Sequence, residues 1–276
     1  MNPFATTTAA GPLSLIDQEK LVGLIREHLA VEMVYLLGIS VNSRITESLF
    51  KKTDSCTPTI ADCYLLILVS EIQNKTLPEW QDQIEQHCNP LVPVTTIVLE
   101  TNTFQKWLTM GHLFARTVYA SATRLYQAEN LVVVPVGSYD RESEQRSIEK
   151  QFGEGLSRSQ EFMAGAELFR LRNHNRLSAF MLHQSAEQAL GTLLKTQTGY
   201  YCCTHNIDRL IRYTGMVTNK LAAVFPRNTD PEKRLFTLLQ RAYIDCRYRE
   251  DYKICNAELL CLMESVKRIQ EIVFTC

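Results

Sequence analysis

Basic and aromatic side chains are concentrated in one late segment of the chain, which spans Arg241 to Tyr252 and has the sequence RAYIDCRYREDY. An arginine guanidinium can donate two parallel hydrogen bonds to a phosphate, and a tyrosine ring can stack on a nucleobase. The segment is therefore a candidate binding site for a nucleotide or RNA. Its candidate ligand-binding residues are Arg241, Tyr243, Arg247, Tyr248, Arg249 and Tyr252. An alternative stays open, in which the arginines pair with Asp245, Glu250 and Asp251 on a solvated helix end.

A second polar group is expected inside the helix predicted over residues 176–196. Glu187 follows His183 by four residues, so both side chains project from one face of this helix. Opposite Arg247 or Tyr248 in a helical bundle, they would form a polar network whose members all need hydrogen-bond partners. Such a network serves either packing or a ligand, and the sequence leaves both interpretations open.

Cys202, Cys203 and His205 supply candidate metal ligands within four residues. A structural zinc site needs a second pair of ligands, and the other cysteines form no Cys-x-x-Cys pair. We therefore expect a loop between helices here and no metal site. In a protein that is not exported, the cysteines should remain reduced thiols.

Strands alternate with helices in the first half of the chain, according to the spacing of its apolar residues. Helices are predicted over residues 14–30, from Pro78 onward, and over 102–127 with a break near Gly111. Buried strands are predicted over residues 33–40, 63–70, 92–100 and 131–136. This order predicts an α/β domain with a mixed sheet over residues 17–138.

After Gly137-Ser138 the strand pattern stops and only helical periodicity follows. Helices are predicted over residues 141–172, 176–196, 207–213, 231–246 and 256–274, with a weaker segment at 217–224. Thr204 and Asn256 are the expected N-caps of the third and the last of these helices. The second domain, residues 139–276, is thus predicted to be an all-α helical bundle.

The composition is that of a globular protein, because 45% of the residues are hydrophobic and 21% are charged. No apolar run is long enough to span a bilayer, so no membrane association is expected. Residues 1–16 lack a basic start and a continuous apolar stretch, so we expect a flexible leader and not a signal peptide. Without an export signal, the expected location is the cytoplasm. Charge is uneven: residues 1–140 carry 9 basic and 14 acidic side chains, and the remainder carries 20 and 16.

Three segments of the second half, taken in order, resemble the HEPN domain. They are Ala179–Leu194 (AFMLHQSAEQALGTLL), Thr204-His205-Asn206-Ile207, and Arg241–Tyr252. HEPN domains combine a helix with a His-Gln…Glu-x-Ala-Leu core, a Thr-His pair before the next helix, and a late Arg-Tyr…Tyr stretch. The resemblance covers residues 155–275 and implies a nucleotide- or RNA-associated bundle.

Some HEPN proteins are ribonucleases, whose signature is Arg, four to six residues, then His. In that chemistry the arginine stabilises charge on the phosphate, and the histidine moves the proton of a 2′-hydroxyl. Arg176 and His183 match the spacing, but they lie on the helix that carries the family's core His-Gln. The late segment, where catalysis would be expected, has no histidine. We therefore expect no RNA cleavage.

The first half resembles, over residues 17–137, the nucleotidyltransferase-like domains that often accompany HEPN domains. That family places Gly-Ser after a first strand, Asp-x-Asp on the second, and a third acid later, and the acids hold two Mg²⁺ ions. Here Ser40 is displaced by one residue, Asp62 is kept, Tyr64 replaces the second aspartate, and Glu100 is the candidate third acid. The resemblance implies a degenerate domain that needs no cofactor, with Mg²⁺ relevant only if Asp62 and Glu100 still form an active site.

Together these patterns favour a two-domain protein that binds a nucleotide or RNA with little or no catalysis, in a regulatory, toxin–antitoxin or defence role. One alternative is an active Mg²⁺-dependent nucleotidyltransferase or HEPN ribonuclease. Another is an oligomeric scaffold without a nucleotide ligand. HEPN-like bundles commonly pair through helices, and the apolar last helix over residues 256–274 predicts a homodimer.

Overall fold

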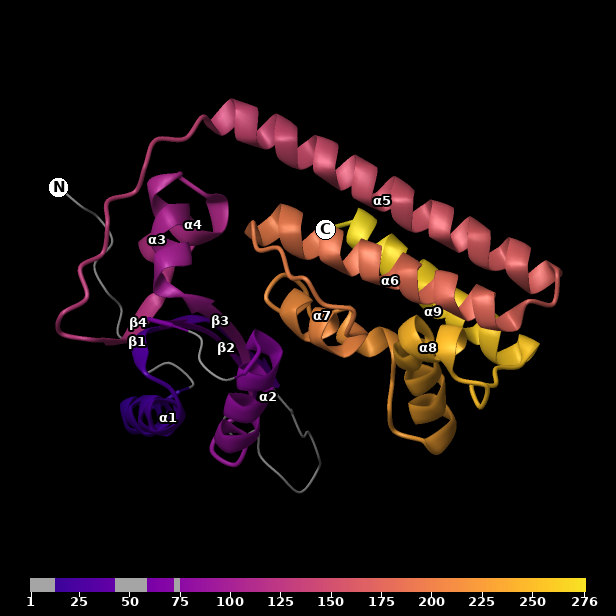
Figure 1. Cartoon of the computed structure of the whole chain (residues 1–276), viewed down its shortest axis with the longest axis horizontal. Helices are drawn as coiled ribbons and strands as arrows, with labels where there is room; N and C mark the ends of the chain where they lie inside the picture. The colour runs from indigo at the N-terminus through magenta and orange to yellow at the C-terminus, as the bar shows by residue number, and fades with distance from the viewer. Residues whose placement is uncertain (1–12, 43–58, 72–74) are drawn as a thin grey trace, which may run out of the picture. The chain divides into compact units, whose positions relative to one another are not determined.

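The computed structural model describes residues 13–42, 59–71 and 75–276, and the chain divides into two compact units, 1–138 and 139–276 (Figure 1). Each unit has a hydrophobic core of its own. The first unit is α/β and the second is helical, as the sequence predicts.

The first unit is built on a mixed sheet in the order β3-β2-β1-β4. Its strands are β1 (Val31–Asn42), β2 (Thr59–Val69), β3 (Val94–Glu100) and β4 (Thr123–Gln127). The strand β1 pairs antiparallel with β2 and β4, whereas β2 pairs parallel with β3. The central strand β2 is apolar on both faces because helices cover both.

Four helices cover this sheet: α1 (Leu15–His28), α2 (Leu77–Cys88), α3 (Thr101–Thr109) and α4 (Leu113–Ser121). The side chains of Ile25 in α1 and Ile84 in α2 pack in one core with Leu65 and Ile67 of β2. Helices α3 and α4 lie on the opposite side of the sheet (Figure 1). Ser14 caps α1 by accepting a hydrogen bond from the amide of Asp17, 3.2 Å away.

Two predictions for this unit were wrong. Residues 131–136 are not a strand; instead β4 forms at Thr123–Gln127, inside the segment predicted as the end of a helix. The break expected near Gly111, whose φ is 66°, is present, but the helix after it, α4, ends already at Ser121. The chain then turns back to β1, where Met33 pairs with Gln127. Val132 is 80% exposed, so this apolar run is not a core strand.

The predicted leader over residues 1–16 is too long, since α1 already begins at Leu15. Leu13 is also buried in the core of the unit. The remainder of that prediction, residues 1–12, lies outside the described residues. In the described part of the chain, no helix is long and apolar enough to cross a membrane.

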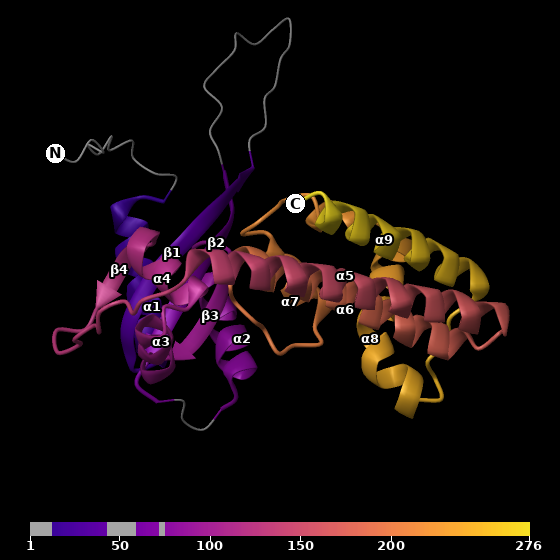
Figure 2. The same cartoon turned by 90° about the horizontal axis from the view of Figure 1, so that it is seen from above.

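The second unit consists of five α-helices and one 3₁₀ turn (Figure 2). They are α5 (Arg141–Leu171), α6 (Asn175–Thr198), α7 (Ile207–Thr214), η1 (Ala222–Val224), α8 (Asp230–Tyr248) and α9 (Asn256–Phe274). Helix α6 is central and contacts α5, α7, α8 and α9. Asp140 caps α5, and Thr229 caps α8 with a capping box to Glu232.

The contact between α5 and α6 depends on small residues. A Cβ on Gly155 would lie 2.1 Å from Oγ1 of Thr192, so only glycine permits this approach. Near the same crossing, buried Ser159 donates a hydrogen bond to the carbonyl oxygen of Ser185 at 2.8 Å. Gln270 of α9 donates to both serine hydroxyls, at 2.9 and 3.1 Å. These contacts fix the register of the three helices.

Two predicted N-caps are displaced. The cap of α7 is Asn206, whose side chain accepts from the amide of Arg209 at 3.0 Å, whereas Thr204 accepts from the amide of Asn206 at 3.2 Å. The cap of α9 is Cys255 and not Asn256. Both helices nevertheless begin at the predicted residues, Ile207 and Asn256, so the capping side chain differs and the helix start does not.

Candidate functional site

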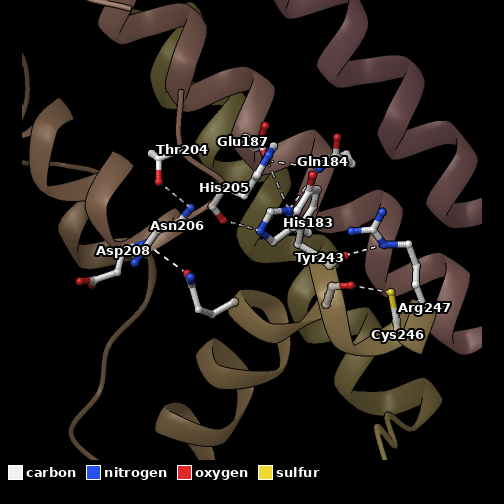
Figure 3. A network of polar contacts seen from close by, with 12 residues as sticks. His183, Gln184, Glu187, Thr204, His205, Asn206, Asp208, Tyr243, Cys246 and Arg247 are labelled. Atoms are coloured by element: carbon white, nitrogen blue, oxygen red, sulfur yellow. Dashed lines mark hydrogen bonds and ion pairs between the residues drawn. The ribbon is translucent and has the colours of Figure 1, made fainter. Parts of the chain in front are cut away.

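A polar network joins α6, the loop before α7, and α8 (Figure 3). At its centre His183 is fully buried, and its Nε2 lies 3.0 Å from the carbonyl oxygen of His205. Because a carbonyl oxygen only accepts, Nε2 must carry the proton and donate. Burial lowers the pKa of His183 to about 4. His183 is therefore a neutral imidazole that holds the loop.

Glu187 lies one helical turn after His183 and contacts the same loop through the side chain of His205. Its carboxylate accepts from Nδ1 of His205 at 3.0 Å and from Nε2 of Gln184 at 3.2 Å. The nearest nitrogen of His183 is 3.6 Å from this carboxylate, too far for a hydrogen bond. Glu187 thus orients His205, whose own side chain is 53% exposed.

The imidazole of His205 lies flat on the ring of Tyr243 from α8. Their centroids are 3.8 Å apart and their planes are inclined by 16°. The Tyr243 ring also lies 5.4 Å from His183 and 6.2 Å from Phe180. An aromatic cluster therefore connects the buried network to the surface of the unit.

Arg247 follows Tyr243 by one turn of α8, and its guanidinium lies over aromatic rings. The guanidinium carbon is 4.5 Å from the Tyr243 centroid and 5.2 Å from those of Phe180 and Tyr248. Its Nε donates to the carbonyl oxygen of Tyr243 at 2.7 Å. In the described part of the chain Arg247 forms no ion pair with a carboxylate. We name His205, Tyr243, Arg247 and Tyr248 the Arg247 surface.

The other predicted ligand residues of α8 are divided between surface and interior. Arg241 pairs with Asp245 and lies 3.8 Å from Asp251, and Arg249 lies 3.6 Å from Asp245. These two arginines therefore pair with carboxylates at the helix end, which is the alternative interpretation that the sequence left open. The prediction that Tyr252 stacks a base was wrong, because this ring is buried and its hydroxyl donates to the carbonyl oxygen of Leu238 at 2.9 Å. Burial raises the pKa of Tyr252 well above its usual range.

Arg176 and His183, the formal ribonuclease pair, are both occupied inside the unit. The guanidinium of Arg176 donates to the carbonyl oxygens of Asp245, Cys246 and Arg249 at 3.3, 3.1 and 2.6 Å. These carbonyls lie at the end of α8, where those of Asp245 and Arg249 also accept from the amides of Arg249 and Tyr252, so Arg176 adds donors that cap the helix end. With Arg176 on backbone carbonyls and His183 fully buried, the pair has no access to a phosphodiester.

In the first unit Ser40 and Asp62 are cross-strand partners in β1 and β2. Thr95 of β3 donates to the Asp62 carboxylate at 2.6 Å, and Tyr64, two residues further, is buried. Glu100, however, pairs with Val69 at the other end of β2. Seven residues of strand separate Asp62 from Val69, which is about 23 Å. Asp62 and Glu100, the two candidate acids of the alternative with an active Mg²⁺ site, therefore do not lie together.

No group of three or more His, Cys, Asp or Glu side chains in the described ranges is arranged to hold a metal ion. The family model of the HEPN domain matches residues 154–274. This part of the chain is similar to the HEPN domain. Among curated proteins, none matches the chain. The match indicates a nucleotide- or RNA-related function in the broad sense.

The sequence predicts that His183 and Glu187 share a face of one helix, opposite Arg247 or Tyr248. The structure places His183 and Arg247 next to the ring of Tyr243, and Glu187 next to His205, which stacks on that ring. Sequence reasoning considered His205 only as a metal ligand and missed its part in this network, although the Thr204-His205 pair belongs to the HEPN pattern. The useful signal was the carboxylate of Glu187, which needs a donor when it is largely buried. That donor comes from a loop, and helical periodicity carries no information about loops.

Proposed function

We propose that the HEPN domain binds RNA or a nucleotide through the Arg247 surface, without cleaving it. The observation that carries this proposal is the placement of the Arg247 guanidinium, which is exposed, lies 4.5 Å from the Tyr243 ring, and has no carboxylate partner among the described residues. A cation held over aromatic rings keeps its hydrogen-bond donors free for an anion.

The chemistry of the Arg247 surface suits a nucleic acid strand. The guanidinium can bind phosphate oxygens, since only its Nε is used inside the domain. Tyr248 is 75% exposed, so its ring can stack on a base. Because stacking and phosphate binding do not depend on the identity of the base, we expect this surface to bind RNA with little sequence preference.

Binding without cleavage is proposed because the residues of the ribonuclease spacing are used structurally. His183 is neutral and buried, and Arg176 holds the end of α8. A regulatory, toxin–antitoxin or defence role in the cytoplasm forms part of the same proposal. The first unit, whose acids lie apart, would then serve as a binding or docking module.

The test is fluorescence anisotropy with a labelled single-stranded RNA of about ten nucleotides, a length that spans one such surface. Arg247→Ala should weaken binding by about tenfold, the effect of losing one charge-assisted hydrogen bond. Arg146→Ala is the matched control, because that arginine is 71% exposed on α5, away from Tyr243. In Arg247→Ala the slope of the logarithm of the binding constant against the logarithm of the salt concentration should also decrease by about one, which corresponds to one lost phosphate contact.

Equal affinity of the wild type and Arg247→Ala would contradict the proposal. So would an equal loss in Arg146→Ala, which would indicate general charge attraction. Cleavage of the RNA by the wild type that disappears in His183→Gln would contradict the assignment of binding without catalysis.

A further inference from the structure

A pocket of about 450 Å³ lies in the HEPN domain between α5, α6 and the loop over residues 199–206. Its volume is within the range of pockets for small ligands and is too small for a folded polymer. Apart from His205 it shares no residue with the Arg247 surface. A ligand in this pocket would therefore be distinct from an RNA strand bound at the Arg247 surface.

The charges around this pocket leave two cations available. Its carboxylates are already paired: Glu154 lies 3.8 Å from Lys150, and Glu187 lies 3.0 Å from His205. Arg158 and Lys195 also line the pocket, and neither forms an ion pair with a carboxylate in the described part of the chain. The balance of free charge therefore favours an anionic ligand.

The pocket also presents a ring. Tyr201 lines it with a side chain that is 62% exposed, and the ammonium of Lys195 lies 5.5 Å from the Tyr201 centroid. An exposed tyrosine offers a face for stacking a planar heterocycle. An aromatic face next to a cation suits a ligand in which a planar ring and a phosphate are joined.

Gly191 is the residue that keeps this space open. It lies in the middle of α6 and lines the pocket, and a Cβ added there would meet no atom within 4 Å. Packing therefore does not require glycine at this position, and helix propensity disfavours it. Gly155, in contrast, is required by its contact with Thr192. The absence of a side chain at 191 instead preserves volume in the pocket.

We propose that this pocket binds a nucleoside monophosphate, with Arg158 and Lys195 holding the phosphate and Tyr201 contacting the base. The volume accommodates one such molecule. Because Glu187 and His205 border the pocket as well as the polar network, the bound ligand would lie directly behind the Arg247 surface.

Isothermal titration calorimetry of the full chain with AMP, GMP, CMP and UMP tests the proposal, with inorganic phosphate, ribose 5-phosphate and adenosine as partial ligands. At least one nucleotide should bind about tenfold more tightly than each partial ligand. Gly191→Leu should fill the pocket and reduce that affinity by at least about tenfold. Gly153→Leu is the matched control, since a Cβ there also meets nothing, yet Gly153 does not line the pocket.

A thermal melt shows whether the leucine variants fold, and both should melt at or above the wild-type temperature. Arg158→Gln, an exposed substitution, provides a second variant that should weaken nucleotide binding. Arg247→Ala should weaken RNA binding by about tenfold and leave nucleotide binding in the pocket unchanged, so each proposal can fail without the other.

Several results would overturn this site. They are no nucleotide binding by the wild type, unchanged binding in Gly191→Leu, and inorganic phosphate binding as tightly as any nucleotide. Loss of nucleotide binding in Arg247→Ala with full binding in Arg158→Gln would place the ligand on the Arg247 surface instead.

Discussion

The imidazole of His205 stacks on the phenol ring of Tyr243, with ring centroids 3.8 Å apart, while its Nδ1 donates to Glu187. One side chain of a loop thus joins α6 to α8. The carboxylate fixes which nitrogen of His205 carries the proton, and the stack fixes the plane of the ring. The exposed Arg247 surface is consequently built on a rigid support and not on a free loop.

The stack should contribute measurably to stability. His205→Ala removes both the ring and the hydrogen bond to Glu187, and should lower the free energy of unfolding by about 1–2 kcal/mol. His205→Phe keeps a ring on Tyr243 and should recover part of this loss. Urea denaturation of the three proteins measures the difference. If His205→Phe were no more stable than His205→Ala, stacking would not be the source.

The buried His183 should make stability depend on pH. Burial lowers its pKa to about 4 from 6.5, so the unfolded chain binds more protons than the folded one between these values. The stabilisation is complete above pH 6.5 and is lost as the pH falls towards 4, up to about 3 kcal/mol. Denaturant unfolding from pH 4 to 8 measures this dependence.

The matched variants for this pH dependence are His183→Gln and His174→Gln. Glutamine keeps an N–H donor for the carbonyl oxygen of His205 but does not titrate. The fall in stability below pH 6.5 should shrink in His183→Gln. It should persist in His174→Gln, which alters an exposed histidine. An unchanged pH profile in His183→Gln would assign the dependence to other groups.

Arg176 should prove to be a structural residue. Arg176→Ala removes the donor to the carbonyl oxygen of Cys246 and a second donor to that of Arg249 at the end of α8, and should destabilise the domain by about 1–2 kcal/mol. The control is Arg172→Ala, because Arg172 is exposed at the end of α5. This substitution should change the free energy of unfolding by less than about 0.5 kcal/mol. Thermal unfolding compares them. A fully stable Arg176→Ala protein would reopen a functional role for this arginine.

The first unit should show no nucleotidyl transfer. Asp62 and Glu100 lie about 23 Å apart along β2 and β3, whereas paired catalytic metal ions lie about 4 Å apart. Incubation with Mg²⁺ and each radiolabelled nucleoside triphosphate should therefore give no product above the level of Asp62→Ala. Turnover in the wild type that Asp62→Ala abolishes would show that other oxygen ligands complete a site.

We also propose that the protein is a homodimer that pairs through helices of the second unit. Most apolar residues of α9 are used in the core of the domain, but Leu260 is 47% exposed. Light scattering at micromolar concentration should give the mass of a dimer, and Leu260→Glu should shift it towards the monomer. A monomeric wild type would exclude this assembly at that concentration.

Much of the fold follows from local patterns in the sequence. Helices α5, α6, α8 and α9 begin and end within a few residues of their predicted bounds, since apolar periodicity and capping residues such as Asp140 act over one or two turns. The three strands with β-rich sequence were also located. The strand β4 was missed because its register depends on β1, which lies about ninety residues earlier in the chain.

The sequence by itself determined the two-unit order and the helical character of residues 139–276. Only the tertiary structure decided which side chains form a site. It buried Tyr252, used Arg176 as a helix cap, and placed the loop residue His205 against Tyr243. Periodicity assigns a residue to a face of one helix, but contacts between distant segments depend on how all the faces pack together.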